Sequence, residues 1–319
     1  MTSIDREGGR LLVTRLATPL VLAAMYGIAA AVSDAFLDPS YVLNLFRQVA
    51  PVGIAAIGVT YVMILGEVDL SVGAVISASV VVCASVMDGD ATRIPLAIGA
   101  TCLLGLSIGA VNGVLVAYGR VSSFILTLGI ALAVTGLTQV YSGGTSHGIV
   151  APGFREFLNA RLWGVVPILG LCLVAFVAVG VTYQRTSAFG RRLYLIGSNR
   201  TAAQLSGLPV ARTIIWAYML SGLLGSFAGM AMIVRSGASG TLTGQGLEFQ
   251  VLAAVVLGGT TFEGGRGGVG GTIAGCFILL IAFNLVILAG LSSYPQLIVM
   301  GAIIISASAI QSRFAGPPR

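Results

Sequence analysis

Long apolar segments separated by short polar ones repeat along almost the whole chain. A helix needs about 20 mostly apolar residues to cross the roughly 30 Å hydrocarbon core of a bilayer, and ten segments approach that length. The pattern therefore predicts an all-α polytopic membrane protein with about ten transmembrane helices. The segments lie near residues 16–33, 45–65, 71–87, 94–117, 122–141, 165–183, 213–233, 247–262, 268–289 and 295–311.

Two of these segments, 71–87 and 247–262, are short, and each adjoins a polar stretch that contains glycine. The stretches are GEVDLSVG at 66–73 and GGTTFEGGRGGVGG at 258–271. They are either cytoplasmic turns or breaks in discontinuous helices, because irregular backbone at membrane depth requires protein or a water-filled cavity to satisfy it. Discontinuous helices would reduce the crossings to eight or nine. Two broken regions also suggest two related halves in an inverted repeat.

The arginines orient the chain. The sequence contains no lysine, and five arginines fall in the long polar segment 184–212, which the positive-inside rule places in the cytoplasm. With both termini cytoplasmic, twelve arginines lie inside and five outside. The inside set is Arg6, Arg10, Arg15, Arg120, Arg185, Arg191, Arg192, Arg200, Arg212, Arg266, Arg313 and Arg319; the outside set is Arg47, Arg93, Arg155, Arg161 and Arg235.

This orientation predicts a single transmembrane domain, 16–311, between a cytoplasmic N-terminal tail, 1–15, and a cytoplasmic C-terminal tail, 312–319. The domain carries the cytoplasmic loop 184–212 and one sizeable outer loop, 142–164. Glycines and Pro152 oppose regular structure at the start of the outer loop, whereas FREFLNARLW is able to form a short helix at the membrane interface. The outer loop either caps the outer mouth or only tethers two spans.

Composition excludes several classes of protein. Hydrophobic residues make up 56% of the chain and charged residues 9%, too apolar for a soluble domain of this size. Topology accounts for the net charge of +6 better than nucleic-acid binding does. A Walker A motif requires lysine, so any ATPase has to be a separate subunit. Neither the lone His147 nor the four cysteines have the spacing of a catalytic or metal site, and we expect no catalytic residue and no metal. The cysteines are Cys83, Cys102, Cys172 and Cys276.

Carboxylates near the membrane are the first candidates for function, because a charge at bilayer depth is costly and is usually paired, solvated or used in transport. Glu67 and Asp69 lie in the first polar stretch. Either this stretch lines a pathway or contacts a neighbouring helix, or Asp69 caps a helix that begins at Leu70 or Ser71. Glu248 and Gln250 open a later span from the outer side, where they either stabilise the helix start or serve transport.

Polar side chains within the spans are the second group of candidates. They could bind a hydroxylated solute, but interhelical hydrogen bonds use the same residue types. The members are Asn112, Thr127, Thr135, Thr138, Gln139 and Asn284. We select Glu67, Asp69, Ser71, Asn112, Thr127 and Asn284 as the candidate pathway or gate. Gly222, Gly225 and Gly229, at helical spacing, predict close helix packing.

The cytoplasmic loop contains SNRTAAQLSG at 198–207, which has start and stop signals for a short helix. Its small residues Ala202, Ala203 and Ser206 suit a helix that docks in a groove on a partner. The alternative is a linker that only sets the topology.

Four stretches together resemble one family. They are VTYVMILGEVDLSVGAV at 59–75, VNGVLVAYGRVSSFILTLG at 111–129, AFGRRLYLIGSNRTAAQLSGLPVAR at 188–212 and AAVVLGGTTFEGGRGGVGGTIAG at 253–275. They closely resemble the membrane permease subunits of bacterial ABC sugar importers, in the ribose/xylose/arabinose branch. The resemblance runs from about residue 40 to residue 310.

The resemblance implies a non-enzymatic permease in the bacterial cytoplasmic (inner) membrane. Its expected partners are a second permease copy or a related permease, an ABC ATPase subunit, a periplasmic or lipid-anchored sugar-binding protein and the lipid bilayer, with no nucleic acid. ATP and Mg²⁺ would bind the ATPase, and this chain would hold no cofactor. The implied ATPase-coupling residues are Gly190, Arg191, Arg192, Asn199, Ala202, Ala203, Leu205, Ser206 and Gly207.

Two positions depart from the family pattern. Glu67 stands where many members have glycine, and Ser122–Ser123 stand where a proline pair is frequent. We therefore expect a monosaccharide or related small polyol as the solute, without naming one. The alternative is an ion-coupled secondary transporter or channel that uses Glu67, Asp69 or Glu248 as its coupling carboxylate.

Overall fold

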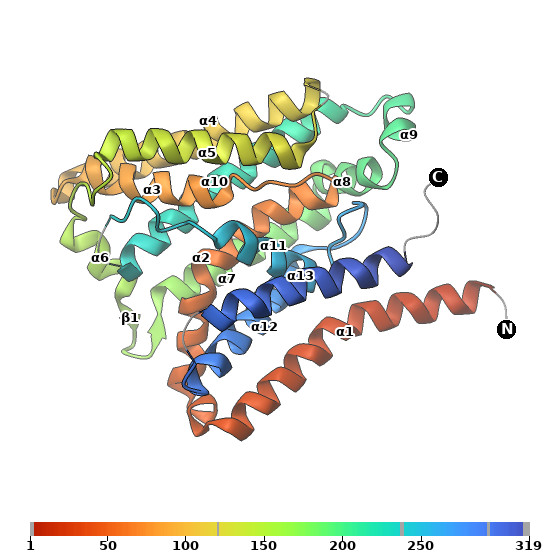
Figure 1. Cartoon of the computed structure of the whole chain (residues 1–319), viewed down its shortest axis with the longest axis horizontal. Coiled ribbons are helices and arrows are strands. Elements are labelled where there is room, and N and C mark those ends of the chain that lie inside the picture. The colour runs from red at the N-terminus through yellow and green to blue at the C-terminus, as the bar shows by residue number, and fades with distance from the viewer. Residues whose placement is uncertain (1–2, 120, 237–238, 292–293, 315–319) are drawn as a thin grey trace.

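The structure is a computed structural model that describes residues 3–119, 121–236, 239–291 and 294–314. Helices dominate the fold (Figure 1). They are α1 (Ser3–Val32), α2 (Pro39–Ile64), α3 (Val72–Met87), α4 (Ile94–Tyr118), α5 (Ser123–Ser142), α6 (Pro152–Asn159), α7 (Ile168–Thr186), α8 (Ala188–Ser198), α9 (Arg200–Leu205), α10 (Val210–Ser236), α11 (Leu247–Leu257), α12 (Val269–Leu288) and α13 (Tyr294–Phe314), with 3-10 turns η1 (Asp34–Leu37) and η2 (Ala91–Arg93) and strands β1 (Arg161–Leu162) and β2 (Val166–Pro167).

Each of the ten predicted apolar segments contains a helix, which confirms the all-α class. Six helices in the described residues are long and apolar enough to cross a membrane: α2, α4 together with η2, α5, α7, α10 and α12. Shorter apolar stretches lie in α1, α3, α11 and α13. Helix α1 begins at Ser3, so most of the predicted N-terminal tail, residues 1–15, is part of this helix.

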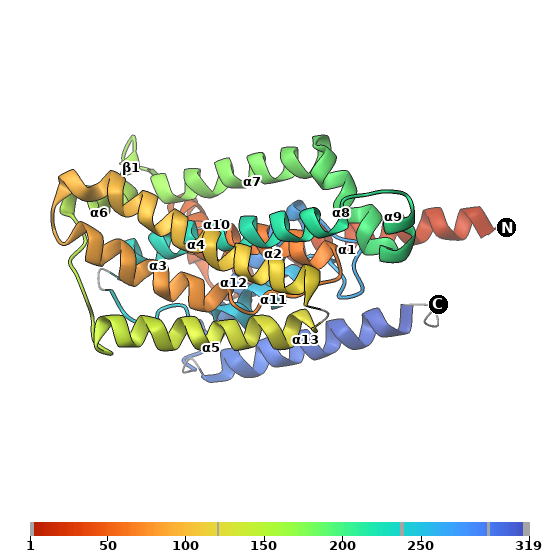
Figure 2. The same ribbon diagram turned by 90° about the horizontal axis from the view of Figure 1, so that it is seen from above.

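The long helices α2 and α10 form the core of the bundle together with the short helices α3 and α11. In α2 and α10, 67% of the most apolar stretch is buried within the protein, against 17% in α5 and 28% in α7. Figure 2 shows α5 and α7 on opposite sides of the central helices. Leucine and valine side chains on α5 remain exposed, as expected where lipid is the solvent.

Glycines allow the central helices to pack closely, as their spacing predicted. A Cβ placed on Gly222 of α10 would collide with the Gly105 carbonyl oxygen of α4, and Gly109 and Gly113 lie equally close to the α10 backbone. Gly229 of α10 contacts the backbone of α3 in the same way. Small residues in these positions bring the helix axes together where no larger side chain would fit.

The two ends of the bundle differ. The start of α1, the end of α13, and the helices α8 and α9 lie at one end, whereas α6 and the β1–β2 hairpin lie at the other (Figures 1 and 2). At the α6 end, Arg47 of α2 donates to the Asn159 side chain at 2.8 Å, and Asn159 donates to the carbonyl of Val234 at 3.3 Å. The loop 142–164 thus packs on the bundle. Its hairpin, in which Arg161 pairs with Pro167, was not predicted.

The two short helices α3 and α11 point in opposite directions. Ile64, at the end of α2, lies against Gly197 of α8, and α3 then runs toward α6, where the Gly89 amide bonds the Ile149 carbonyl. After α10 the chain turns back into the bundle through a re-entrant segment, residues 239–246, whose Gly244 amide donates to the Ser77 hydroxyl of α3 at 2.9 Å. From there α11 runs toward the α8 end.

The order of long helix, irregular segment and short helix therefore occurs twice, in α2–α3 and α10–α11, in opposite orientations. This arrangement fits the inverted halves suggested by the sequence. One expectation needs correction. Glu248 does not open a full span at the outer side, because α11 has only 11 residues and Glu248 lies against Gly73 in the first turn of α3.

Candidate functional site

The site is built around the α2–α3 linker, residues 65–71. The helix α2 ends at Ile64, and Gly66 turns the chain at φ +78°, a conformation that favours glycine. The linker then enters the bundle between α4, α5 and α10. Buried peptide groups in such a segment need hydrogen-bond partners, since lipid supplies none.

Side chains of α5 and α10 satisfy the linker backbone. The Val68 amide donates to the Ser123 hydroxyl at 3.1 Å, and the Leu70 amide donates to the Thr127 hydroxyl at 3.0 Å. The Tyr218 hydroxyl donates to the Val68 carbonyl at 2.9 Å. Three side chains thus replace the hydrogen bonds that a continuous helix would have made.

Asp69 lies at the centre of the linker and is 3% exposed. Its Oδ1 accepts from the Ser71 amide at 2.9 Å and the Ser71 hydroxyl at 2.6 Å, and its Oδ2 accepts from the Ser221 hydroxyl of α10 at 2.7 Å. Ser71, not Asp69, is the N-cap residue of α3. The carboxylate therefore hydrogen-bonds the first residues of α3 and also joins them to α10. It thus combines the helix-start role and the contact with a neighbouring helix, which the sequence offered as alternatives.

Asn112 completes this arrangement from α4. Its Nδ2 donates to the Ser71 hydroxyl at 2.7 Å. The residue is fully buried, and its Oδ1 has no hydrogen-bond partner among the described residues. We call Asp69, Ser71, Asn112, Thr127 and Ser221 the polar cluster. Four of its five members were predicted as pathway residues.

Glu67 connects the linker to the polar loop 184–212. Its Oε1 lies 2.8 Å from Nη1 of Arg200, the first residue of α9. The Glu67 side chain is 13% exposed and that of Arg200 43%, so solvent partly screens the pair. Beside this pair is a cavity of about 470 Å³, bordered by Gly66, Ser122 and Ser123. The ion pair joins two segments that are 133 residues apart in sequence.

The predicted short helix of the loop is present as α9. The Asn199 side chain accepts from the Ala202 amide at 2.9 Å, and Gly207, at φ +76°, follows the helix end. Ala203 is buried, whereas Leu205 is 86% exposed.

The helix α8, which precedes α9, was not predicted. Ser187 caps it by accepting from the Gly190 amide at 3.0 Å, and Gly190 packs against the Gln184 backbone. Arg191 is exposed and donates to the Thr186 carbonyl at 3.1 Å. Arg192 is half-buried. These contacts place the predicted coupling residues on two helices at one end of the bundle.

A second irregular segment, the α11–α12 linker (residues 258–268), packs against α8 and the end of α2 at the same end of the bundle. The Gly265 amide donates to the Ile64 carbonyl at 2.8 Å. The Tyr194 hydroxyl of α8 donates to the Gly267 carbonyl at 2.8 Å and accepts from Gln184 at 2.9 Å. Burial raises the pKa of the Tyr194 phenol above its ordinary value.

The remaining predicted residues lie elsewhere. Asn284 of α12 is 3.4 Å from the Tyr41 hydroxyl, and Thr138 bonds the Val134 carbonyl within α5, so both contact packing partners outside the polar cluster. The described residues contain no group of three or more His, Cys, Asp or Glu side chains that could hold a metal ion.

Sequence reasoning missed four contributors: Ser123, Tyr218, Ser221 and Arg200. Tyr218 and Ser221 are three residues apart and therefore share one face of α10, a signal visible in an otherwise apolar span. Arg200 was used only to orient the chain in the membrane. Its partner Glu67 is too distant in sequence for spacing to reveal the pair.

Known proteins resemble this chain over most of its length. Residues 41–308 match the family described as Branched-chain amino acid transport system / permease component. The chain is 35% identical to the ribose import permease protein of Escherichia coli K12 over 301 residues, which covers 92% of each chain. It is 37% identical to the ribose import permease protein of Bacillus subtilis over 284 residues, 88% of this chain and 87% of that one.

A third relative is the L-arabinose ABC transporter permease protein of Azospirillum brasilense, 32% identical over 302 residues, 95% of this chain and 88% of that one. No solved structure matches the chain. The family match covers most of the sequence, and relatives above 30% identity align over nearly their whole length. The chain therefore belongs to this family of transport-system permease components.

Proposed function

We propose that this chain is the transmembrane permease subunit of an ATP-driven importer for a monosaccharide or related small polyol. The relatives are named for ribose and L-arabinose, whereas the family description names branched-chain amino acids. The relatives align over nearly the whole chain, and the hydroxyl, amide and carboxylate groups of the polar cluster suit a polyhydroxylated solute. Both arguments favour a sugar.

The main observation in support of the proposed mechanism is the Glu67–Arg200 ion pair. It joins α9, the proposed contact for an ATPase subunit, to the linker that carries Asp69 and Ser71. Closure of the ATPase dimer would move α9, and this pair would transmit the movement to the linker. The permease would thereby change between outward-facing and inward-facing states.

The exposed side chain of Leu205 supports α9 as the docking element, because a helix-in-groove contact requires an apolar anchor. The exposed Arg191 on α8 would add a charged contact beside it. The chain contains no lysine, which a Walker A motif requires, and we therefore expect ATP and Mg²⁺ to bind another subunit. A binding protein would deliver the solute at the α6 end.

The proposal includes a topology and an assembly. The α8–α9 end and both termini face the cytoplasm, the chain crosses the bacterial inner membrane about ten times, and two permeases, identical or related, enclose the pathway. The cavity beside Glu67 and Arg200 would then open toward the cytoplasm and serve as the exit for the solute.

A charge exchange tests the transmission step. Arg200→Glu places two carboxylates together and should lower ATP-dependent sugar uptake at least about fivefold, the lower end of a typical coupling free energy. The double variant Glu67→Arg/Arg200→Glu restores opposite charges and should recover much of the uptake. Arg185→Glu, a charge reversal at the end of α7, is the matched control. Normal uptake by Arg200→Glu in proteoliposomes would contradict the proposed transmission.

One observation favours the ion-coupled alternative: Asp69 is a buried carboxylate at membrane depth. Co-purification in mild detergent separates the two functions. A stoichiometric ATPase that is lost from a Leu205→Glu variant supports the importer. Isolation of the permease alone, with uptake driven by an ion gradient, supports the secondary transporter.

A further inference from the structure

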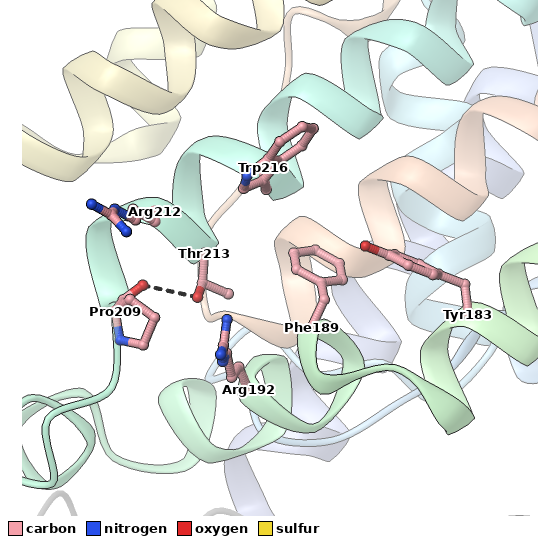
Figure 3. Close-up of a pocket in the computed structure, with 7 residues that line it drawn as sticks. All are labelled: Tyr183, Phe189, Arg192, Pro209, Arg212, Thr213 and Trp216. Carbon is pink, nitrogen blue, oxygen red and sulfur yellow. Dashed lines mark hydrogen bonds between the residues drawn. The ribbon is translucent and has the colours of Figure 1, made fainter.

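Two arginines on different helices line one cavity near the ends of two spanning helices. The cavity has a volume of about 360 Å³. Figure 3 shows its lining: Arg192 comes from α8, Arg212 and Trp216 come from α10, and the rings of Tyr183 and Phe189 form one wall. The Arg192 guanidinium points toward Thr213 in this view. The cavity therefore combines cationic and aromatic groups.

The two arginines have no counterion within the described residues. The ion pairs there are Arg93 with Asp90 and Arg200 with Glu67, and the hydrogen bonds of the described residues include none from the Arg192 or Arg212 side chain. Thr213 is also buried, with its hydroxyl donating to the Pro209 carbonyl at 2.9 Å. Two guanidinium groups without acidic partners make this cavity a site for an anion, and guanidinium geometry suits phosphate oxygens.

The aromatic wall indicates where the anion comes from. Tyr183 and Phe189 stack with ring centroids 5.4 Å apart, and Trp216 is 55% exposed. Tyrosine and tryptophan are typical of the membrane interface. Tyr183 is in the last turn of α7, and Val179, one turn earlier on this helix, is exposed. An apolar surface for an acyl chain thus continues from the cavity along α7.

We propose that this cavity binds the phosphate head group of an anionic phospholipid from the surrounding bilayer. Arg192 and Arg212 hold the phosphate, and Tyr183, Phe189 and Trp216 contact the glycerol and the upper acyl chains. Basic pockets between spanning helices are known to bind such head groups. A bound lipid would connect α8 to α10, the two helices that flank α9. The binding does not depend on the proposed function, whereas any effect on coupling does.

Native mass spectrometry of the full-length protein tests the site. The protein is exchanged into mixtures of phosphatidylcholine and phosphatidylglycerol, and the lipids retained after mild activation are identified. Arg192→Gln should weaken phosphatidylglycerol retention about tenfold and Arg212→Gln by a smaller factor, because each removes a charge-assisted hydrogen bond. Trp216→Leu should weaken retention of both lipids, since it removes the aromatic contact but no charge.

The control is Arg155→Gln/Arg161→Gln, which removes two exposed charges at the α6 end and should leave retention unchanged. Monodispersity and the unfolding midpoint in detergent establish that each variant is folded. Equal phosphatidylglycerol retention by folded Arg192→Gln and wild type would overturn the proposal. Displacement of the lipid by millimolar inorganic phosphate would assign the cavity to a soluble anion and would also overturn it.

A protein partner is the remaining occupant to exclude. A Trp216→Cys variant in the native complex reports whether an ATPase subunit covers the cavity. Labelling by a lipid-phase maleimide supports the lipid site, whereas crosslinking to a cysteine of the ATPase would assign the arginines to that subunit and contradict the proposal.

Discussion

The two irregular linkers of this bundle are held in different ways. Hydroxyl and carboxylate side chains hold the α2–α3 linker, with Asp69 bonded to Ser71 and Ser221. Close backbone contacts hold the α11–α12 linker, where Gly264 lies on Gly66 and Gly265 lies on Ser198. A side-chain hydrogen bond can exchange one partner for another during a conformational change. A close contact between glycine backbones has no alternative partner, so it is either kept or lost. We infer that the first linker switches and the second serves as its fixed support.

The largest expected effect is the loss of stability when the α11–α12 linker, the proposed fixed support, is disrupted. Gly264→Ala would place a Cβ 2.6 Å from the Gly66 nitrogen at a residue with φ +81°. Steric conflict and backbone strain together should cost about 3 kcal/mol of folding free energy. The unfolding midpoint and the yield of monodisperse protein measure it.

Gly270→Ala is the control for this substitution. Gly270 lies six residues further on, in the first turn of α12, and apart from its chain neighbours and the backbone of its own helix no heavy atom lies within 4 Å of the position that an alanine Cβ would take there. It should fold normally. A Gly264→Ala protein as stable as Gly270→Ala would show that the glycine contacts do not fix the linker.

Removing the carboxylate of the other linker should have the next largest effect. Asp69→Ala leaves the buried Ser71 and Ser221 hydroxyls without their acceptor and should cost about 2 kcal/mol. We expect sugar uptake to be lost even in the fraction that folds, and Asp69→Asn to be intermediate. Asp88→Asn, at the exposed other end of α3, is the control. Uptake at the wild-type level by Asp69→Ala would contradict a role of the polar cluster in transport.

A pair of tyrosines compares the linkers directly. Tyr218→Phe removes the donor to Val68 in the first linker, and Tyr194→Phe removes the donor to Gly267 in the second. Each should cost about 1 kcal/mol of stability. We expect uptake to fall only in Tyr218→Phe, because glycine contacts still hold the second linker. A reversed order of uptake would assign the switching role to the second linker.

The smallest expected effect on stability is that of the ion pair. Arg200→Gln should change the folding free energy by less than about 1 kcal/mol, because the pair is partly exposed. Its proposed effect is on uptake, so stability and function should separate in this variant. A stability loss as large as that of Asp69→Ala would make the pair a structural contact.

Local signals in the sequence were enough to predict most of the helices. The apolar segments locate the spanning helices, and Asn199 with Gly207 delimits α9. The four motifs also led to the correct family. The helix α8 was missed because its Arg191 and Arg192 were interpreted as loop charges, and the β1–β2 hairpin because two-residue strands have no periodicity.

Long-range contacts limited the prediction of the site. Asp69, Ser71, Asn112 and Thr127 were selected as buried polar residues, and the structure brings them together. Asn284 met the same criterion but lies beside Tyr41, because polarity alone does not specify which face of a helix meets which neighbour. The re-entrant segment was not predicted, because the contact of Gly244 with α3 does not affect the hydropathy pattern.

Among the described residues, the buried Oδ1 of Asn112 accepts no hydrogen bond, so the polar cluster has one acceptor that remains to be satisfied. A buried acceptor without a donor costs about 1 to 3 kcal/mol. Any conformation that admits water or a solute hydroxyl to this oxygen recovers that free energy. The described arrangement is thus closer in free energy to its alternatives than a fully satisfied cluster would be, and a modest ligand-binding energy is sufficient to change the population between them.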